Sequence, residues 1–233
     1  MLTIRKAADR GVTSFGWLDS RHSFSFGQYR DPDNMGFGPL RVINDDRVAP
    51  GKGFPEHPHR NMEIISYVVE GRLAHKDSTG AEREVGRGGI QRMTAGRGVY
   101  HSEFNPSSSE PTRLLQIWIE PEAPGLDPSY EDRLINPDDE PGKLHVIATR
   151  HPSEGQAIIH QDATVYAGVF KKDDAATLAI GAGRRAWIQV VTGELAVNGE
   201  TLTEGDGAAL TDEPSVELTA VADGTELLVF DLP

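Results

Sequence analysis

Two short histidine motifs hold the residues of this chain that are best suited to chemistry. Residues 57–59 read His-Pro-His, and residues 101–103 read His-Ser-Glu. In an extended segment, side chains two positions apart point to the same face, so each motif presents two potential ligands together. If the two segments lie side by side, three imidazoles and a carboxylate converge, a set with affinity for divalent first-row metals. The metal ligands that we predict are His57, His59, His101 and Glu103.

The composition limits what can hold a metal and what the protein can bind. The 233 residues include no cysteine, so disulfides, thiolate ligands and cysteine nucleophiles are excluded. A formal charge of -13 and a pI near 5.0 disfavour binding to nucleic acid or anionic lipid. Neither a signal-peptide-like segment at the N-terminus nor an apolar run of membrane-spanning length is found. We therefore expect a cytoplasmic protein with no nucleic-acid or membrane partner.

The distribution of apolar residues predicts an all-β fold. The chain has 25 glycines and 15 prolines spread along its length, as expected of short strands joined by tight turns. Apolar runs of strand length occur at residues 40–43, 64–69, 114–119, 187–191, 194–197 and 227–232. Helical periodicity is confined to short candidates near residues 128–135 and 172–176. A sandwich or barrel with few peripheral helices follows.

An internal repeat indicates two copies of one barrel. Residues 67–73 resemble residues 189–195 at an offset of 122, and each block is a strand, a turn on a glycine and the next strand. Residues 121–141 are rich in turn-forming proline pairs and indicate a connecting segment. We predict a metal-binding domain over residues 1–135 and a second barrel without metal over residues 136–233.

The histidines are shared unequally between the two halves. All eight lie before residue 161, so the second repeat has none in its core. At the offset of 122, the positions of His57, His59 and Glu63 are taken by Ala179, Gly181 and Arg185. The first barrel alone should therefore bind metal. We interpret the other histidines as structural or solvent-exposed, with His22 the favoured exception because it lies in an aromatic run.

Several motifs carry a resemblance to a known family. Residues 51–71 and 98–105 resemble the two cupin motifs, and the chain more specifically resembles the pirin family of bicupins, including its bacterial quercetin 2,3-dioxygenases. The matching stretches are residues 16–20, 22–26, 34–37, 40–46, 57–64 and 101–106. The resemblance implies two tandem cupin barrels, which are double-stranded β-helices of the jelly-roll type. It covers nearly the whole chain.

Two positions depart from the general cupin pattern. Gly96 stands where the second motif usually has proline, and Glu63 follows His59 one residue earlier than the usual carboxylate ligand does. Strand parity then turns Glu63 differently from His59. The pirin pattern instead implies that Glu103 is the carboxylate ligand, and Glu63 is assigned a structural or supporting role.

The resemblance also implies a reaction, namely the opening of a flavonol such as quercetin by O2 with release of carbon monoxide. The partners are then a small aromatic substrate and O2, with Glu103 as general base. Fe(II) is our first choice of metal, and Ni, Cu, Mn, Co and Zn bind such ligands too. The aromatic, glycine-rich stretch at residues 22–37 would either cover the barrel mouth or seal a sheet edge.

Two other functional classes remain open. The metal could serve a metal-sensing or redox-sensing regulatory protein that acts through a protein partner, with the same fold and site. A cupin isomerase or epimerase for sugars is less favoured, because the sequence shows no carboxylate or lysine outside the ligand set clearly placed as its base. A monomer is expected, because two barrels in one chain can cover each other's exposed sheets.

Overall fold

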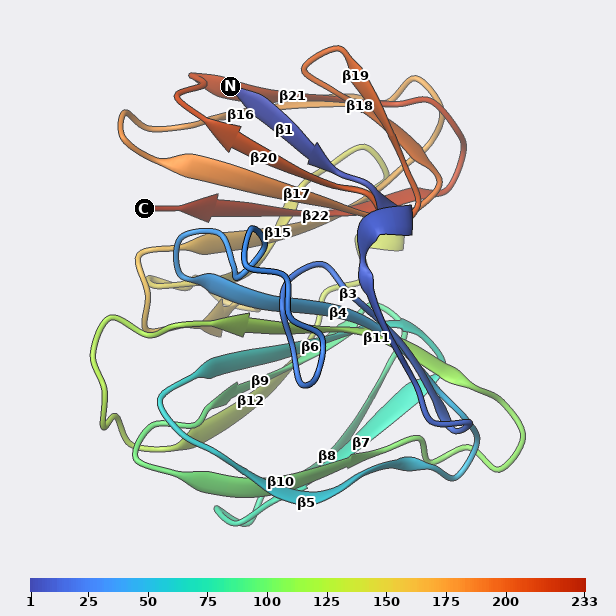
Figure 1. Cartoon of the computed structure of the whole chain (residues 1–233), viewed down its shortest axis with the longest axis vertical. Helices are drawn as coiled ribbons and strands as arrows, with labels where there is room; N and C mark the ends of the chain where they lie inside the picture. The colour runs from blue at the N-terminus through green and yellow to red at the C-terminus, as the bar shows by residue number, and fades with distance from the viewer.

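The computed structural model describes residues 1–233, and its regular structure is almost entirely β-strand, arranged in two barrels stacked along the long axis (Figure 1). Its helices are two single 3₁₀ turns, η1 (Ala7–Asp9) and η2 (Pro137–Asp139). None of the helices has the length and apolar character needed to cross a membrane. The all-β prediction is confirmed.

The N-terminal barrel, the lower one in Figure 1, consists of a seven-stranded and a four-stranded antiparallel sheet. The large sheet has the order β12 (Ser129–Leu134), β9 (Gly89–Thr94), β6 (Glu63–Glu70), β11 (Thr112–Ile119), β4 (Leu40–Val48), β3 (Leu18–His22) and β2 (Gly11–Ser14). The small sheet has the order β5 (Gly53–His59), β10 (Val99–Phe104), β7 (Arg72–Asp77) and β8 (Glu82–Gly86).

The C-terminal barrel repeats this architecture. Its large sheet has the order β1 (Leu2–Arg5), β20 (Gly207–Thr211), β17 (Arg185–Thr192), β22 (Thr225–Leu232), β15 (Thr164–Phe170), β13 (His145–Thr149) and β14 (Ala157–Ile158). Its small sheet has the order β16 (Ala175–Ala179), β21 (Ser215–Ala220), β18 (Glu194–Val197) and β19 (Glu200–Thr203). The order β9-β6-β11-β4 corresponds to β20-β17-β22-β15, and β5-β10-β7-β8 corresponds to β16-β21-β18-β19. The predicted duplication is therefore confirmed.

The repeated turn depends on one glycine in each barrel. Gly71, between β6 and β7, has φ of 74°, and Gly193, between β17 and β18, has φ of 79°. A Cβ at Gly71 would lie 2.7 Å from the Pro111 carbonyl oxygen, and one at Gly193 would lie 2.6 Å from the Thr225 hydroxyl. Both the left-handed backbone and the close packing require glycine at these positions.

All six apolar runs named from the sequence are strands, but both predicted helices are wrong. Residues 129–134 form β12, which pairs along β9, and residues 172–176 turn at Asp173 and enter β16. In both places strand pairing with a neighbouring sheet edge outweighs a weak local helical pattern. The predicted first domain also needs a correction, because its residues 2–5 form β1 and pair with β20 in the other barrel.

The connection between the barrels runs from β12, in the first, to β13, in the second, and contains η2. The domain boundary near residue 135 stays a prediction. By position, β1 occupies the edge of the C-terminal sheet that β12 occupies in the N-terminal sheet. The chain thus closes its second barrel with its own N-terminal strand, which lies beside β20 at the top of Figure 1.

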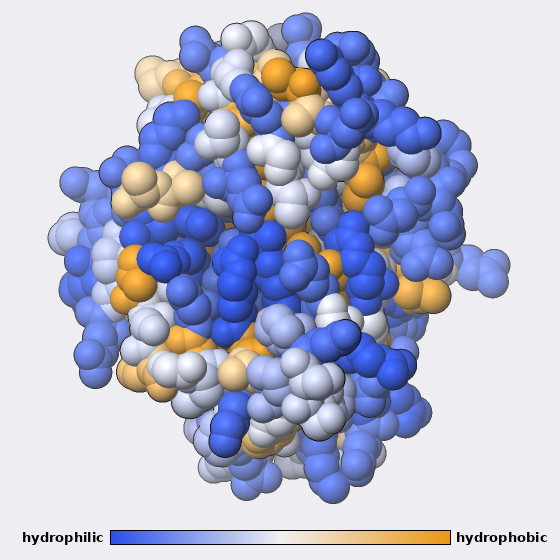
Figure 2. Space-filling view, turned by 90° about the vertical axis from the view of Figure 1, so that its right-hand side faces the viewer, coloured by the Kyte–Doolittle hydropathy of each residue, from blue (hydrophilic) through white to orange (hydrophobic).

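The largest apolar core lies between the barrels. Its 22 buried residues come from both halves of the chain, including Ile65 and Ile117 from the first barrel and Phe230 and Leu228 from the second. Each large sheet therefore covers the outer face of the other. The face of the molecule seen in Figure 2 is mostly hydrophilic, with small scattered apolar patches.

Candidate metal centre

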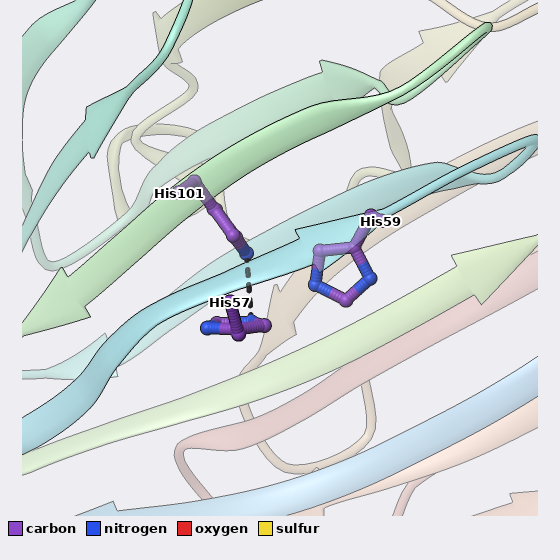
Figure 3. A group of neighbouring side chains, drawn as sticks. All are labelled: His57, His59 and His101. Atoms are coloured by element: carbon purple, nitrogen blue, oxygen red, sulfur yellow. Dashed lines mark hydrogen bonds between the residues drawn. The ribbon is translucent and has the colours of Figure 1, made fainter.

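Three of the predicted ligands meet inside the N-terminal barrel. β5 and β10 are neighbours in the small sheet, and His57 is the direct cross-strand partner of His101. Their Nε2 atoms are 3.0 Å apart, and the His59 ring centroid lies 4.8 Å from that of His101. One nitrogen from each of the three rings lies within 4.8 Å of the others. Figure 3 shows the rings converging from the two strands. We call these residues the three-histidine group.

The backbone brings these strands unusually close at one end. A Cβ at Gly53 would lie 2.1 Å from the Glu103 carbonyl oxygen, so only glycine allows β5 to approach β10 there. The register shifts between His101 and Glu103, which marks a β-bulge next to the site. The glycine and the bulge together set the angle at which the histidines meet.

Burial keeps the imidazoles of His59 and His101 neutral and able to act as ligands. Desolvation, together with the neighbouring imidazoles, lowers the pKa of His59 to about 4 and the pKa of His101 to about 3. The Nδ1–H of His57 donates to the Pro55 carbonyl oxygen at 2.8 Å. Its Nε2 is then left with a lone pair that faces the group.

Glu103 lies beside this group and is firmly held. It falls in a second, overlapping set with His75 and His101, all three of them buried. Its two carboxylate oxygens accept hydrogen bonds from the Ser66 hydroxyl and the Gln116 amide, each at 2.8 Å. His101 is thus common to both sets, whereas Glu103 is not part of the three-histidine group.

Glu63 lies outside both sets. Its carboxylate accepts a hydrogen bond from the Thr94 hydroxyl at 2.9 Å and faces His160 Nδ1 at 3.2 Å. This position agrees with the supporting role that strand parity assigned to it. His160 connects it to the segment that precedes β15.

A cavity of about 470 Å³ adjoins the histidines. Its volume is in the range of small-molecule sites. Aromatic side chains from the first part of the chain and from β11 form much of its wall: Phe15, Phe26, Tyr29, Phe54 and Trp118. His57, His59 and Glu103 also line it. Residues 22–37 were predicted either to cover the barrel mouth or to seal a sheet edge. Phe26 to Tyr29 line the cavity, which fits the first interpretation. The preceding strand, β3, extends the large sheet.

A row of polar side chains crosses the inner face of the large sheet beneath this cavity. Strand register places its members directly opposite one another, in the order His22, Asn44, Gln116, Ser66 and Gln91. All are buried, and His22 donates through Nδ1–H to the Asn44 oxygen at 2.7 Å. The row divides the apolar interior of this barrel into clusters of five and four residues.

The second barrel has an apolar interior in the same place. Its core cluster of 15 buried residues fills the space between its two sheets. Because Leu218 pairs with Val197 as Glu103 pairs with His75, strand register relates Glu103 to Leu218 and His101 to Val216. Leu178, which pairs with Val216, corresponds in the same way to His57. The positions that correspond to His57, His101 and Glu103 therefore hold apolar residues.

Sequence reasoning missed two features of the site. His75 was interpreted as structural or solvent-exposed, yet it is buried with its Nδ1 3.4 Å from His101 Nδ1. A signal was present, because the offset of 122 replaces His75 with Val197, as a lost site would require. Asp46 was also missed, and it is a buried carboxyl in the cavity wall outside the ligand set.

Asp46 predicts a specific pH dependence of stability. Burial is the main cause that raises its pKa to about 7 from 3.8, opposed by a Ser20 hydrogen bond and assisted by the charges of Asp45 and Glu103. A carboxyl whose pKa is raised in the folded state binds its proton more tightly there than when unfolded. Its contribution to stability is therefore greatest below 3.8 and is lost as the pH rises through about 7.

We therefore expect Asp46→Asn to weaken this pH dependence. Between pH 5 and pH 8, the metal-free wild-type protein should lose about 3 kcal/mol more unfolding free energy than the variant, at about 1.4 kcal/mol per pKa unit. Urea unfolding at the two pH values measures the difference. Asp9→Asn, at an exposed position, should behave like the wild type. Equal losses in Asp46→Asn and the wild type would contradict the assignment.

Comparison with known proteins places the chain among well-defined relatives. Residues 4–119 match the Pirin family model, and residues 146–232 match the model of the quercetinase C-terminal cupin domain. The chain is 46% identical over 233 residues to the quercetin 2,3-dioxygenase of Escherichia coli strain K12, covering 100% of this chain and 99% of the relative. It is 40% identical to a pirin-like protein of Caulobacter vibrioides, over 97% of both chains.

A solved structure agrees closely with this fold. The bacterial pirin YhhW from Escherichia coli, crystallised in complex with nickel(II), superposes with a TM-score of 0.94 at 44% identity. The match covers 100% of this chain and 99% of that one.

Proposed function

Because the chain belongs to the pirin family, we propose that it is a metal-dependent oxidoreductase of the quercetin 2,3-dioxygenase type. The observation that carries the proposal is a group of three converging imidazoles, two of which line an aromatic-walled cavity. We take the reaction type from the Escherichia coli relative, which is 46% identical and is named quercetin 2,3-dioxygenase. The substrate is a flavonol or another enediol-like molecule, and the second substrate is O2.

The donor set fits a single divalent transition metal ion. Two imidazole nitrogens, on His57 and His101, are 3.0 Å apart, and a nitrogen of His59 lies within 4.8 Å of both. We propose Glu103, which lines the same cavity as His57 and His59, as the carboxylate ligand. Imidazole and carboxylate ligands suit iron, nickel, copper, manganese, cobalt and zinc. We take Fe(II) as the native ion, while the similar bacterial pirin was crystallised with nickel(II). When bound, the ion supplies a positive charge that acidifies a substrate hydroxyl and promotes the reaction with O2.

The cavity walls suit a flat aromatic substrate. The Trp118 ring stands edge-on to His59 with centroids 5.0 Å apart, and Phe26 packs edge-on against Trp118 at 5.3 Å. A planar ring in the cavity, placed against these groups, makes aromatic contacts with them.

Glu103 is the group that we assign to proton transfer. It lines the cavity, and the Ser66 and Gln116 hydrogen bonds fix its orientation. A carboxylate has about four acceptor sites, so Glu103 retains sites for a substrate hydroxyl. In this role it accepts the hydroxyl proton as general base.

Turnover by the loaded protein tests this function. Protein supplied with Fe(II) in air should consume quercetin and O2 and release carbon monoxide. Glu103→Gln keeps the shape of the side chain but removes the base, so the turnover rate should fall by about 100-fold or more. Glu63→Gln is the matched control and should retain most of the rate.

Two outcomes would count against the proposal. If no product forms with iron, nickel, copper, manganese or cobalt bound stoichiometrically, the enzyme assignment fails, and the sensing function considered from the sequence is favoured. If Glu103→Gln turns over at the wild-type rate, the assignment of the base fails.

A further inference from the structure

Two residues outside the predicted ligand set make a continuous chain of contacts to His101. We propose that Asp77 and His75 form a relay that fixes the proton of His101 on Nδ1, so that the lone pair on its Nε2 faces His57. The relay rests on the proposed metal site, and it assigns a positioning function to residues that do not themselves touch the ion.

The first member of the relay is held in one orientation. Asp77 Oδ1 accepts hydrogen bonds from the Thr79 amide at 2.8 Å, the Thr79 hydroxyl at 2.6 Å and the Ala81 amide at 3.2 Å. These contacts occupy one carboxylate oxygen within the turn that follows β7. The other oxygen, Oδ2, is thereby directed at His75 Nε2, at 2.9 Å.

The position of each proton follows from this arrangement. A carboxylate oxygen only accepts, so His75 carries its proton on Nε2, and its Nδ1 bears a lone pair. That lone pair lies 3.4 Å from His101 Nδ1, which must then be the protonated nitrogen. A neutral imidazole has one N–H, so His101 Nε2 is left as an acceptor.

The consequence appears where His101 meets His57. The His57 Nδ1–H donates to the Pro55 carbonyl, so His57 also presents a lone pair on Nε2. The two Nε2 atoms lie 3.0 Å apart, within hydrogen-bond distance, and a proton on either one would form an N–H···N hydrogen bond between them (dashed line in Figure 3). With the protons that the relay assigns to both Nδ1 atoms, neither Nε2 can donate. Two lone pairs at this distance repel each other unless a cation lies between or beside them. The relay thus prevents a competing N–H···N hydrogen bond and leaves both nitrogens free for the ion.

Packing buries the relay away from solvent and holds its side chains in place. His75 is 3% exposed and Asp77 is 9% exposed. The Tyr130 ring stacks on the His75 ring, with centroids 4.4 Å apart and planes 24° apart. Both side chains are on the inner face of β7, opposite Glu103 and His101 of β10.

The second barrel lacks the relay together with the ligand that the relay serves. Strand register relates His75 to Val197 and His101 to Val216. At the offset of 122 that relates His75 to Val197, Asp77 corresponds to Gly199. Loss of all three polar groups is the pattern expected when the relay and the ligand have one function.

Asp77→Asn separates this proposal from a purely structural function in the turn. The three donors of the turn require an oxygen at the Oδ1 position, so the amide NH2 takes the place of Oδ2. It then donates to His75 Nε2, which moves the His75 proton to Nδ1. His75 in turn donates to His101 Nδ1, and the His101 proton moves to Nε2, where it blocks the ligand nitrogen. The turn keeps its hydrogen bonds while the site loses a lone pair.

Metal binding measures the effect without any reliance on turnover. Co(II) serves as the probe, with its affinity measured by competition with a chelator and its coordination followed by the visible absorption spectrum. We expect Asp77→Asn to lower the Co(II) affinity by about 10-fold to 100-fold and to change the spectrum. Thermal unfolding of the metal-free variant should match that of the wild type. Asp174→Asn, which replaces a turn aspartate in the second barrel, should leave both readouts unchanged.

A second variant tests the tautomer argument directly. Glutamine has no tautomers, and its amide oxygen can accept the His101 Nδ1–H without help from residue 77. His75→Gln combined with Asp77→Asn should therefore bind Co(II) more tightly than Asp77→Asn alone, within a few-fold of the wild type. Wild-type affinity in Asp77→Asn, or affinity in the double variant no higher than in the single one, would overturn the relay. Lack of turnover by the wild-type protein would refute the proposed function only.

Discussion

Replacing His101 with alanine is expected to abolish stoichiometric metal binding. His101 is the residue common to both sets of converging ligands, it is 2% exposed, and its Nε2 lies 3.0 Å from that of His57. Loss of a partner outside the ligand shell typically costs about 10-fold to 100-fold in metal affinity. Loss of this central ligand should therefore cost at least about 100-fold.

Metal content after dialysis, together with chelator competition, measures this loss. His151→Ala is the matched control, because His151 is exposed and far along the chain from both motifs. Glu63→Gln should also keep its metal, since Glu63 contacts Thr94 and His160 instead of the three-histidine group. Retention of one equivalent of metal by His101→Ala would refute the assignment of the site.

The second large effect concerns stability at the contact between the barrels. Arg113 is 4% exposed and binds both oxygens of Asp45, each at 2.9 Å, and it donates at 2.9 Å to the Val191 carbonyl of the other barrel. Burial alone would raise the pKa of Asp45, but the hydrogen bonds and charge of Arg113, with the charges of Arg47 and Arg10, hold it below its ordinary value. Asp45 is therefore ionised at neutral pH.

Arg113→Met should destabilise the protein by about 3–5 kcal/mol, because it leaves a buried carboxylate without its main partner. Urea unfolding at pH 7 measures this loss. The difference from the wild type should shrink as the pH falls below 3.8, since a carboxyl with a lowered folded-state pKa loses its contribution on protonation. Arg72→Met, which breaks an ion pair with Glu84 whose arginine is 68% exposed, should cost less than about 1 kcal/mol. Equal costs for the two variants would contradict this account of the interface.

Much of the fold could be predicted because its signals are local. Apolar runs of strand length gave the core strands, and the spacing of two in 57–59 and 101–103 placed side chains on one face of β5 and β10. The edge strands could not be found in this way. β12 and β1 are defined by the sheet edges that they pair with, far away in the sequence, and their own residues carry little strand signal.

The internal repeat was informative only where the loops have equal length. The offset of 122 relates β6 to β17 and β7 to β18, but β21 begins only 116 residues after β10. A single offset therefore could not find the counterpart of His101. His75 was missed for a different reason, since its significance depends on contact with His101, which belongs to another strand.

The origin of β1 has a consequence for the order in which the protein is synthesised. Leu2 pairs with Leu210, so the ribosome releases the strand about two hundred residues before its partner exists. The first barrel can assemble during translation, whereas this segment must wait, unpaired, until β20 emerges. Until it docks, the nascent second barrel presents an open strand edge of the kind that invites aggregation. The second barrel is thus completed by a strand that is synthesised about two hundred residues before β20.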